Sequence, residues 1–141
     1  MHKQMESGTH GRKWYMTEGN IAFSFATRPN CNIEALEGIT LEIAETILQI
    51  FKQMYGIDLE IKLPNDIVKN GKKIGGILTQ TKLQGKTVKY LVIGIGINTS
   101  KISYEGATSI KKEWNIEVDN SKVITRFYNV FKEKLIKRME N

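Results

Sequence analysis

Three groups of polar and glycine residues interrupt the apolar pattern of this sequence. They are "SGTHGRKW" (7–14), "KLPND" (62–66) and the glycine segments "KKIGGIL" (72–78) and "GIGIN" (94–98). The first group combines two glycines with hydroxyl groups, Arg12 and Lys13, and loops of this composition can bind phosphate through backbone N–H groups and positive charge. All three groups fall where strands are predicted to end or bend, and they are the candidates for chemistry.

The segment "KLPND" holds more functional groups than a turn requires. Pro64 ends or bends a strand because it cannot donate a ladder hydrogen bond, but a turn needs neither Lys62 nor Asp66. Lys73 leads into two glycines, 75–76, and glycine inside a strand loses stability and packs nothing, so the pair indicates that a ligand or another backbone comes close. Considered singly, Asp66 could cap a turn and Lys73 could be a solvated charge beside a hairpin.

Composition limits the class of protein. The chain has 141 residues, of which 40% are hydrophobic and 26% charged, the balance of one globular domain. Cys31 is the only cysteine, which excludes an internal disulfide, and His2 and His10 are too isolated to predict a metal site. No apolar run approaches the roughly 20 residues of a membrane span, and no signal peptide is recognised. These features predict a cytoplasmic protein.

The net charge of +6 has two interpretations. Lysine and arginine neutralise phosphates in nucleic-acid-binding proteins. However, the lysines are spread along the chain with acidic residues between them, and no nucleic-acid-binding motif is recognised. We therefore favour a solvated surface that suits anionic small ligands, and expect neither DNA nor a membrane as a partner.

Periodicity predicts the elements that position these groups. Residues 20–28 alternate as a strand that Pro29 ends. Apolar residues at three- to four-residue spacing predict a long helix that starts near Asn32 and ends at Gly56, and a second helix over 120–139 with a cap at 119–121.

Strand-like runs joined by short turns lie between the two helices. Residues 58–63 alternate up to Pro64, and Asn70-Gly71 predicts a type I′ hairpin between 66–69 and 72–82. Residues 87–98 are apolar on both faces, which indicates a central strand. The expected fold is an α+β domain with a mixed, mainly antiparallel sheet and helices on one face.

The order of the motifs resembles the catalytic domain of the biotin protein ligases. The matching stretches are "GRKW" (11–14), "ATRP" (26–29), "KLPND" (62–66), "KIGGIL" (73–78) and "VIGIGIN" (92–98). "ATSI" (107–110) is similar to the segment after the family's last sheet strand, and the resemblance extends from about Gln4 to the last helix. It implies the core that biotin ligases share with class II aminoacyl-tRNA synthetases.

The resemblance also implies an activity, its substrates and the residues that serve it. The family forms biotinyl-adenylate from biotin and ATP and transfers biotin to a lysine of a biotin carboxyl carrier domain. The implied catalytic residues are Lys73, Arg12 and Asp66, of which Asp66 would also bind Mg²⁺. The implied biotin-binding residues are Gln4, Ser7, Gly8, Thr9, Lys73, Gly76 and Gly94. The implied ATP- or adenylate-binding residues are Arg12, Trp14, Asn65, Lys73 and Asn98.

Three departures from the family pattern leave alternatives open. Thr9 stands where most members have arginine, Leu63 replaces a tryptophan, and the family's upstream biotin-contacting strand is missing. We therefore interpret residues 1–141 as a partial catalytic domain, without the helix-turn-helix and β-barrel domains of longer members. The alternatives are a remnant that only binds a ligand or partner, and a lipoate-type acyl-protein ligase. The missing strand would leave an unpaired sheet edge, so we expect a homodimer.

Overall fold

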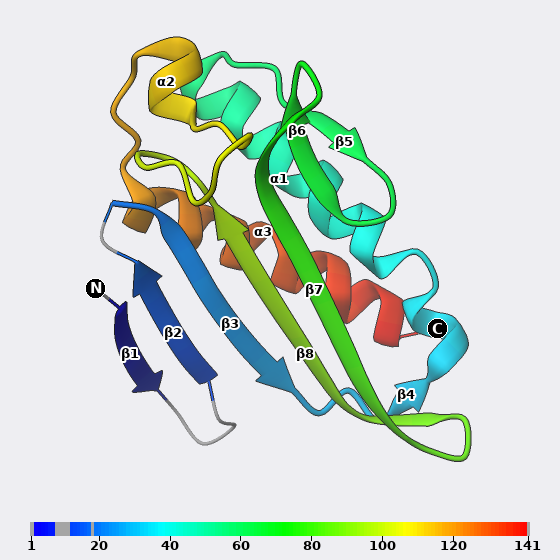
Figure 1. Ribbon diagram of the computed structural model, residues 1–141. Helices are drawn as coiled ribbons and strands as arrows, with labels where there is room; N and C mark the ends of the chain where they lie inside the picture. Colours follow the sequence, from blue (N-terminus) through cyan, green and yellow to red (C-terminus); the bar gives the residue numbers. More distant parts are fainter. Residues whose placement is uncertain (1, 8–11, 18, 141) are drawn as a thin grey trace.

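A sheet of 8 strands lies in front of two long helices in the computed structural model (Figure 1), which describes residues 2–7, 12–17 and 19–140, with side chains for 19–140. The strands run in the order β1-β2-β3-β8-β7-β6-β5, and β4 pairs with β8. Their bounds are β1 His2–Ser7, β2 Arg12–Thr17, β3 Ile21–Thr27, β4 Cys31–Asn32, β5 Glu60–Lys62, β6 Asp66–Lys69, β7 Lys72–Gln84 and β8 Thr87–Ile97.

The predicted α+β class is confirmed, with one change in the sheet. Every strand pairing within the described residues is antiparallel, where a mixed sheet was expected. The central position predicted for 87–98 is also confirmed, because β8 lies between β3 and β7. The Asn70-Gly71 hairpin joins β6 to β7 with positive φ at both residues, 50° and 78°, as a type I′ turn requires.

The two long helices, α1 (Ile39–Tyr55) and α3 (Asn120–Met139), lie on one face of the sheet (Figure 1). The short helical segments are η1, a 3₁₀ turn over Ile33–Leu36, and α2 (Ile110–Trp114). Asp119 caps α3, because its carboxylate accepts a hydrogen bond from the Lys122 N–H, and this predicted helix is confirmed. No helix in the described part of the chain combines the length and apolar character that crossing a membrane would need.

The first predicted helix is divided in two. The Asn32 side chain does accept a hydrogen bond from the Glu34 N–H, but it caps only η1. Gly38 then adopts a left-handed conformation with φ of 75°, which interrupts the helical path, and α1 begins at Ile39. Gly56 ends α1 in the same left-handed conformation, as predicted.

The two faces of the sheet differ in what they contact. Alternate residues of β3 and β8, such as Phe23 and Ile93, are buried against the helices, and the Phe23 ring meets the Phe127 ring of α3 at 5.9 Å. The residues between them, such as Gly94 and Gly96, are only partly buried and point to the opposite side. We call that side the open face.

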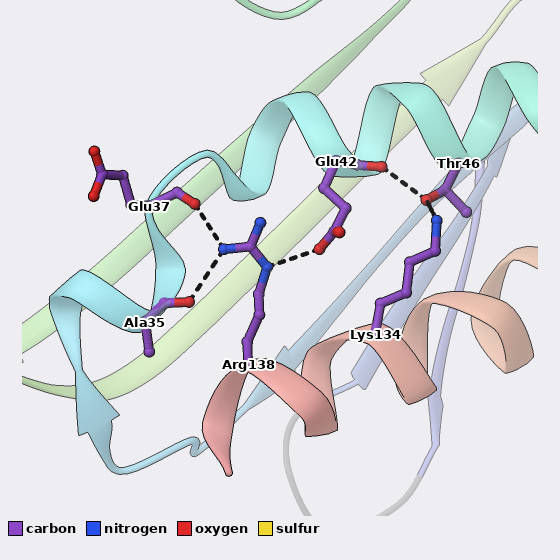
Figure 2. Close-up of polar contacts among 6 residues, drawn as sticks. All are labelled: Ala35, Glu37, Glu42, Thr46, Lys134 and Arg138. Atoms are coloured by element: carbon purple, nitrogen blue, oxygen red, sulfur yellow. Dashed lines mark hydrogen bonds and ion pairs between the residues drawn. The ribbon is translucent and has the colours of Figure 1, made fainter. Parts of the chain in front are cut away.

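Arg138 connects the end of α3 to the start of α1 (Figure 2). Its Nε donates to Glu42 Oε1 at 2.7 Å, and its Nη1 donates to the backbone oxygens of Ala35 and Glu37 at 3.1 and 2.6 Å. One turn earlier in α3, the Lys134 ammonium donates to Thr46 Oγ1 at 2.8 Å. Arg138 therefore satisfies backbone oxygens that the break at Gly38 leaves outside the helix.

Arg138→Ala is expected to lower the free energy of unfolding by about 1–3 kcal/mol, because a charged donor and three acceptors lose their hydrogen bonds together. Arg138→Lys keeps the charge but loses the planar fork, so we expect an intermediate loss. Urea unfolding of the three proteins provides the measurement. Equal stability of Arg138→Ala and the unmodified chain would contradict the role assigned to this contact.

The expected homodimer stays a prediction. β1 and β5 are the edge strands of the described sheet, and the free side of an edge strand can pair with another chain. We expect light scattering to give a mass that rises towards that of a dimer with concentration. A single-chain mass at every concentration would contradict this expectation.

Candidate active site

A β-bulge in β7 brings Lys73 onto the open face. Asp66 pairs with Gly76 and Ile67 with Gly75, but Val68 pairs with Lys73, so Ile74 is an extra residue. Lys73 and Gly76 are three residues apart and would point to opposite faces in a regular strand. The extra residue at the bulge places both on the same face. Lys73, Gly76 and Asp66 therefore share the open face.

These residues line an open pocket of about 310 Å³ on that face. It is lined by Asn65, Asp66, Lys73, Gly76, Ile77, Leu78, Gly94 and Gly96. The structure thus brings together five residues that the sequence assigned to the site, from three separate motifs. They come from the turn after β5 and from strands β6, β7 and β8.

Lys73 and Asp66 form an ion pair at the wall of the pocket. The Lys73 Nζ lies 3.2 Å from Asp66 Oδ1, and their side chains are 40% and 30% exposed. This contact argues against the alternative in which Lys73 extends into water from the hairpin. Lys72, the neighbouring lysine, is exposed and pairs in register with Lys69, so the two adjacent lysines have different surroundings.

The strand glycines fall into two groups. A Cβ on Gly75 would lie 2.5 Å from the Gly96 oxygen, so the neighbouring backbone excludes any larger residue there. A Cβ on Gly94 or Gly96 would meet nothing nearer than 3.9 or 4.0 Å. A Cβ on Gly76 would meet the movable end of Lys73 at 3.4 Å and Asp66 Oδ1 at 3.8 Å. The close approach of the neighbouring backbone therefore explains why residue 75 is a glycine. Gly76, Gly94 and Gly96 instead form a pocket floor without side chains.

Asn65 lies where "KLPND" turns from β5 into β6. Its Nδ2 donates to the Ile77 oxygen at 3.1 Å, and its own backbone oxygen accepts from the Ile77 N–H at 3.0 Å. These two bonds hold the turn against β7. The regular strand β5 ends at Lys62, before Pro64, as predicted, and Asn65 is fixed at the rim of the pocket.

Asn98 differs from its expected position. It is predicted to contact ATP, but its side chain is buried and its Nδ2 donates to Ser103 Oγ and the Thr108 oxygen at 3.0 and 3.1 Å. Asn20 Nδ2 donates to its Oδ1 at 3.4 Å. The amide of Asn98 therefore holds residues 99–108 in place and does not line the pocket.

Two of the site residues predicted near the N-terminus, Gly8 and Thr9, lie outside the residues that the structure describes. Ser7 ends β1 and Arg12 begins β2, with the two paired in register, so Ser7 and 12–14 belong to strands where a loop was expected. Gln4 and Trp14 lie in the same two strands, on the far side of β3 from β8.

Three pocket residues, Ile77, Leu78 and Gly96, were not assigned to the site from the sequence. Leu78 is an apolar residue with 57% of its surface exposed, and Gly96 lies in the pocket floor beside Gly94. Strand alternation could have indicated Leu78 and Gly96, because Leu78 follows Gly76 by two residues and Gly96 follows Gly94 by two.

The pocket could offer a magnesium ion one protein carboxylate, that of Asp66. Within the described residues no group of three or more His, Cys, Asp or Glu side chains lies close enough to hold a metal. Mg²⁺ commonly binds one or two carboxylates together with substrate phosphates. Asp66 at the pocket wall fits this mode.

This α+β domain therefore has an open pocket on one face of its sheet, with an ion pair at the pocket wall and glycines in its floor. Residues 4–98 match the model of the biotin/lipoate A/B protein ligase family. The chain belongs to this family.

Comparison with curated and solved proteins points to the biotin ligases. The chain is 33% identical to the bifunctional ligase/repressor BirA of Bacillus spizizenii, over 90% of this chain and 42% of BirA. It is 32% identical to the biotin–[acetyl-CoA-carboxylase] ligase of Paracoccus denitrificans, over 71% of this chain and 42% of that protein. It therefore spans less than half the length of these curated relatives.

A solved structure supports the same fold. The biotin protein ligase of Aquifex aeolicus in complex with biotin and ATP superposes with a TM-score of 0.69 at 27% identity. The match covers 93% of this chain and 56% of that protein. The predicted resemblance to a biotin ligase catalytic core is confirmed.

Proposed function

We propose that this chain catalyses the ATP-dependent biotin–protein ligase reaction. The main observation behind the proposal is the Lys73–Asp66 ion pair beside the glycine floor of the pocket. The residues of this pair and of the floor belong to the motifs that resemble those of the biotin ligases. The biotin and ATP bound in the Aquifex protein support the choice of substrates.

In the first step, an oxygen of the biotin carboxylate bonds to the α-phosphorus of ATP, and the bond to the β-phosphate oxygen breaks. The products are biotinyl-adenylate and pyrophosphate. Two anions must approach each other, so a positioned cation contributes most where charge accumulates. Lys73 takes this role between carboxylate and α-phosphate, and Asp66 holds its ammonium over the floor. Mg²⁺, when bound through Asp66, would neutralise phosphate charge.

In the second step, the neutral amine of an acceptor lysine attacks the carbonyl carbon of the mixed anhydride. The carbon–oxygen bond to the phosphate breaks, AMP leaves, and the nitrogen loses a proton. The pocket opens on the face of the sheet opposite the helices, and an acceptor protein can approach from there. The acceptor that fits this chemistry is a biotin carboxyl carrier domain.

The remaining site residues belong to the same proposal. Gln4, Ser7, Gly8 and Thr9 contact biotin, and Arg12 and Trp14 contact the phosphates and adenine. We further propose a cytoplasmic protein that binds no DNA.

Calorimetric titration with biotin, followed by ATP and Mg²⁺, tests the proposal. We expect biotin to bind and ATP with Mg²⁺ to give heat and released pyrophosphate only when biotin is present. Binding of biotin without pyrophosphate release would indicate a remnant that only binds ligand. Binding of lipoate in place of biotin would indicate a lipoate-type ligase.

A further inference from the structure

The positive charge of the chain is concentrated on one part of the sheet. Residues 67–104 contain seven lysines and neither aspartate nor glutamate, so the rest of the chain is close to neutral. This segment covers most of β6, all of β7 and β8, and the loop after β8. This segment therefore lacks the acidic residues that separate the lysines elsewhere in the chain.

Two cations lie beside one aromatic ring near the end of the β7–β8 hairpin. Lys82 pairs with Tyr90 across the two strands, and the Arg28 guanidinium lies 5.1 Å from the centre of the Tyr90 ring. Tyr90 is 38% exposed and lies on the open face, because it alternates in step with Gly94 and Gly96. Lys86 is exposed in the turn that joins the strands.

These cations lack acidic partners in the part of the chain whose side chains are described. The ion pairs within residues 19–140 join Lys52, Lys73, Lys111 and Arg138 to carboxylates, and none involves Arg28, Lys82 or Lys86. Unpaired cations raise the positive potential of the surface that carries them. The hairpin end therefore attracts an anionic surface.

Lys82 and Tyr90 lie on the same face as the pocket, because they pair directly across the strands and Tyr90 alternates in step with Gly94 and Gly96. Gly94 and Tyr90 are four residues apart in β8, about 13 Å at a rise of roughly 3.3 Å per residue. Exposed Leu78 lies at the pocket end of this stretch. A protein that rests on the stretch could contact the cations and still place a lysine side chain in the pocket.

We propose that the open face between the glycine floor and the cations of the hairpin end, Arg28, Lys82 and Lys86, is the docking surface for an acidic face of the acceptor protein. The inference rests on the proposed ligase function. Complementary charge would guide the acceptor onto the face from which its lysine reaches the adenylate. Charges of this kind act mainly on association and its dependence on salt.

Charge reversal with a matched control tests the docking surface. Lys82→Glu/Lys86→Glu changes the hairpin, and Lys122→Glu/Lys132→Glu makes the same charge change on exposed residues of α3, on the helix side. Binding of a purified carrier domain with an unmodified lysine is measured by biolayer interferometry at low and high salt. Pyrophosphate release from biotin and ATP, with hydroxylamine as acceptor, is measured separately on the same proteins.

We expect the hairpin variant to bind the carrier domain about tenfold more weakly at low salt, with little difference at high salt. The α3 variant should change by less than about twofold, and pyrophosphate release should be equal in all three proteins. Equal effects of the two variants, or no carrier binding by the unmodified chain, would overturn the docking surface. Tighter binding to a short DNA duplex than to the carrier, lost in the hairpin variant, would overturn it too.

The two readouts separate the two proposals. Carrier binding that depends on the hairpin charges, without any pyrophosphate release, would retain the docking surface and reject the ligase activity. Normal pyrophosphate release, together with carrier binding that is the same in the hairpin variant and the unmodified chain, would retain the ligase activity and reject the docking surface.

Discussion

Lys73→Ala is expected to lower biotin-dependent pyrophosphate release from ATP by about 100- to 1000-fold, the loss typical when one positioned charge-stabilising donor is removed. The variant removes the ammonium that Asp66 holds at the pocket wall. Lysine suits a bridge between two anions because its charge is compact and its stem flexible. The rate of the first chemical step should therefore fall strongly, while the free energy of unfolding should change little.

Lys72→Ala is the matched control. Lys72 is the preceding residue, has the same charge, and is exposed at the start of β7, so its removal should leave the rate nearly unchanged. Pyrophosphate release is followed by a coupled assay, with unfolding curves to show that both variants fold. Equal losses in the two variants would reject the role of Lys73.

Substitutions at neighbouring glycines should separate ligand binding from folding. Gly76→Val and Gly94→Val are expected to abolish biotin binding with little loss of stability, because each adds bulk to the pocket floor where the protein itself leaves room. Gly75→Ala should instead lower the free energy of unfolding by about 1–3 kcal/mol, since its Cβ would meet the Gly96 oxygen at 2.5 Å and overpacking has costs of that size.

Two glycine variants are needed because of Lys73. A side chain at Gly76 would contact the Lys73 ammonium, whereas one at Gly94 would first meet Leu78. Biotin titration and thermal unfolding of each variant give the two measurements. Unchanged biotin affinity in Gly94→Val would show that the pocket is not the biotin site.

The sequence by itself determined the elements whose causes are local. The Asn70-Gly71 turn follows from two residues that tolerate positive φ, and α3 follows from its apolar period and the cap at Asp119. The central place of β8 follows from apolar residues on both faces. Lys73, Asp66, Asn65, Gly76 and Gly94 were also identified from the sequence, because the motif order resembles a known family.

The tertiary structure decided which of these residues meet. Alternation along a regular strand places Lys73 and Gly76 on opposite faces, and only the register between β6 and β7 introduces the bulge at Ile74 that unites them. Asn98 follows the same strand pattern as Gly94 and Gly96, yet its amide is taken up by Asn20, Ser103 and Thr108. Register and long-range hydrogen bonds join residues far apart in the chain, so local periodicity carries no information about them.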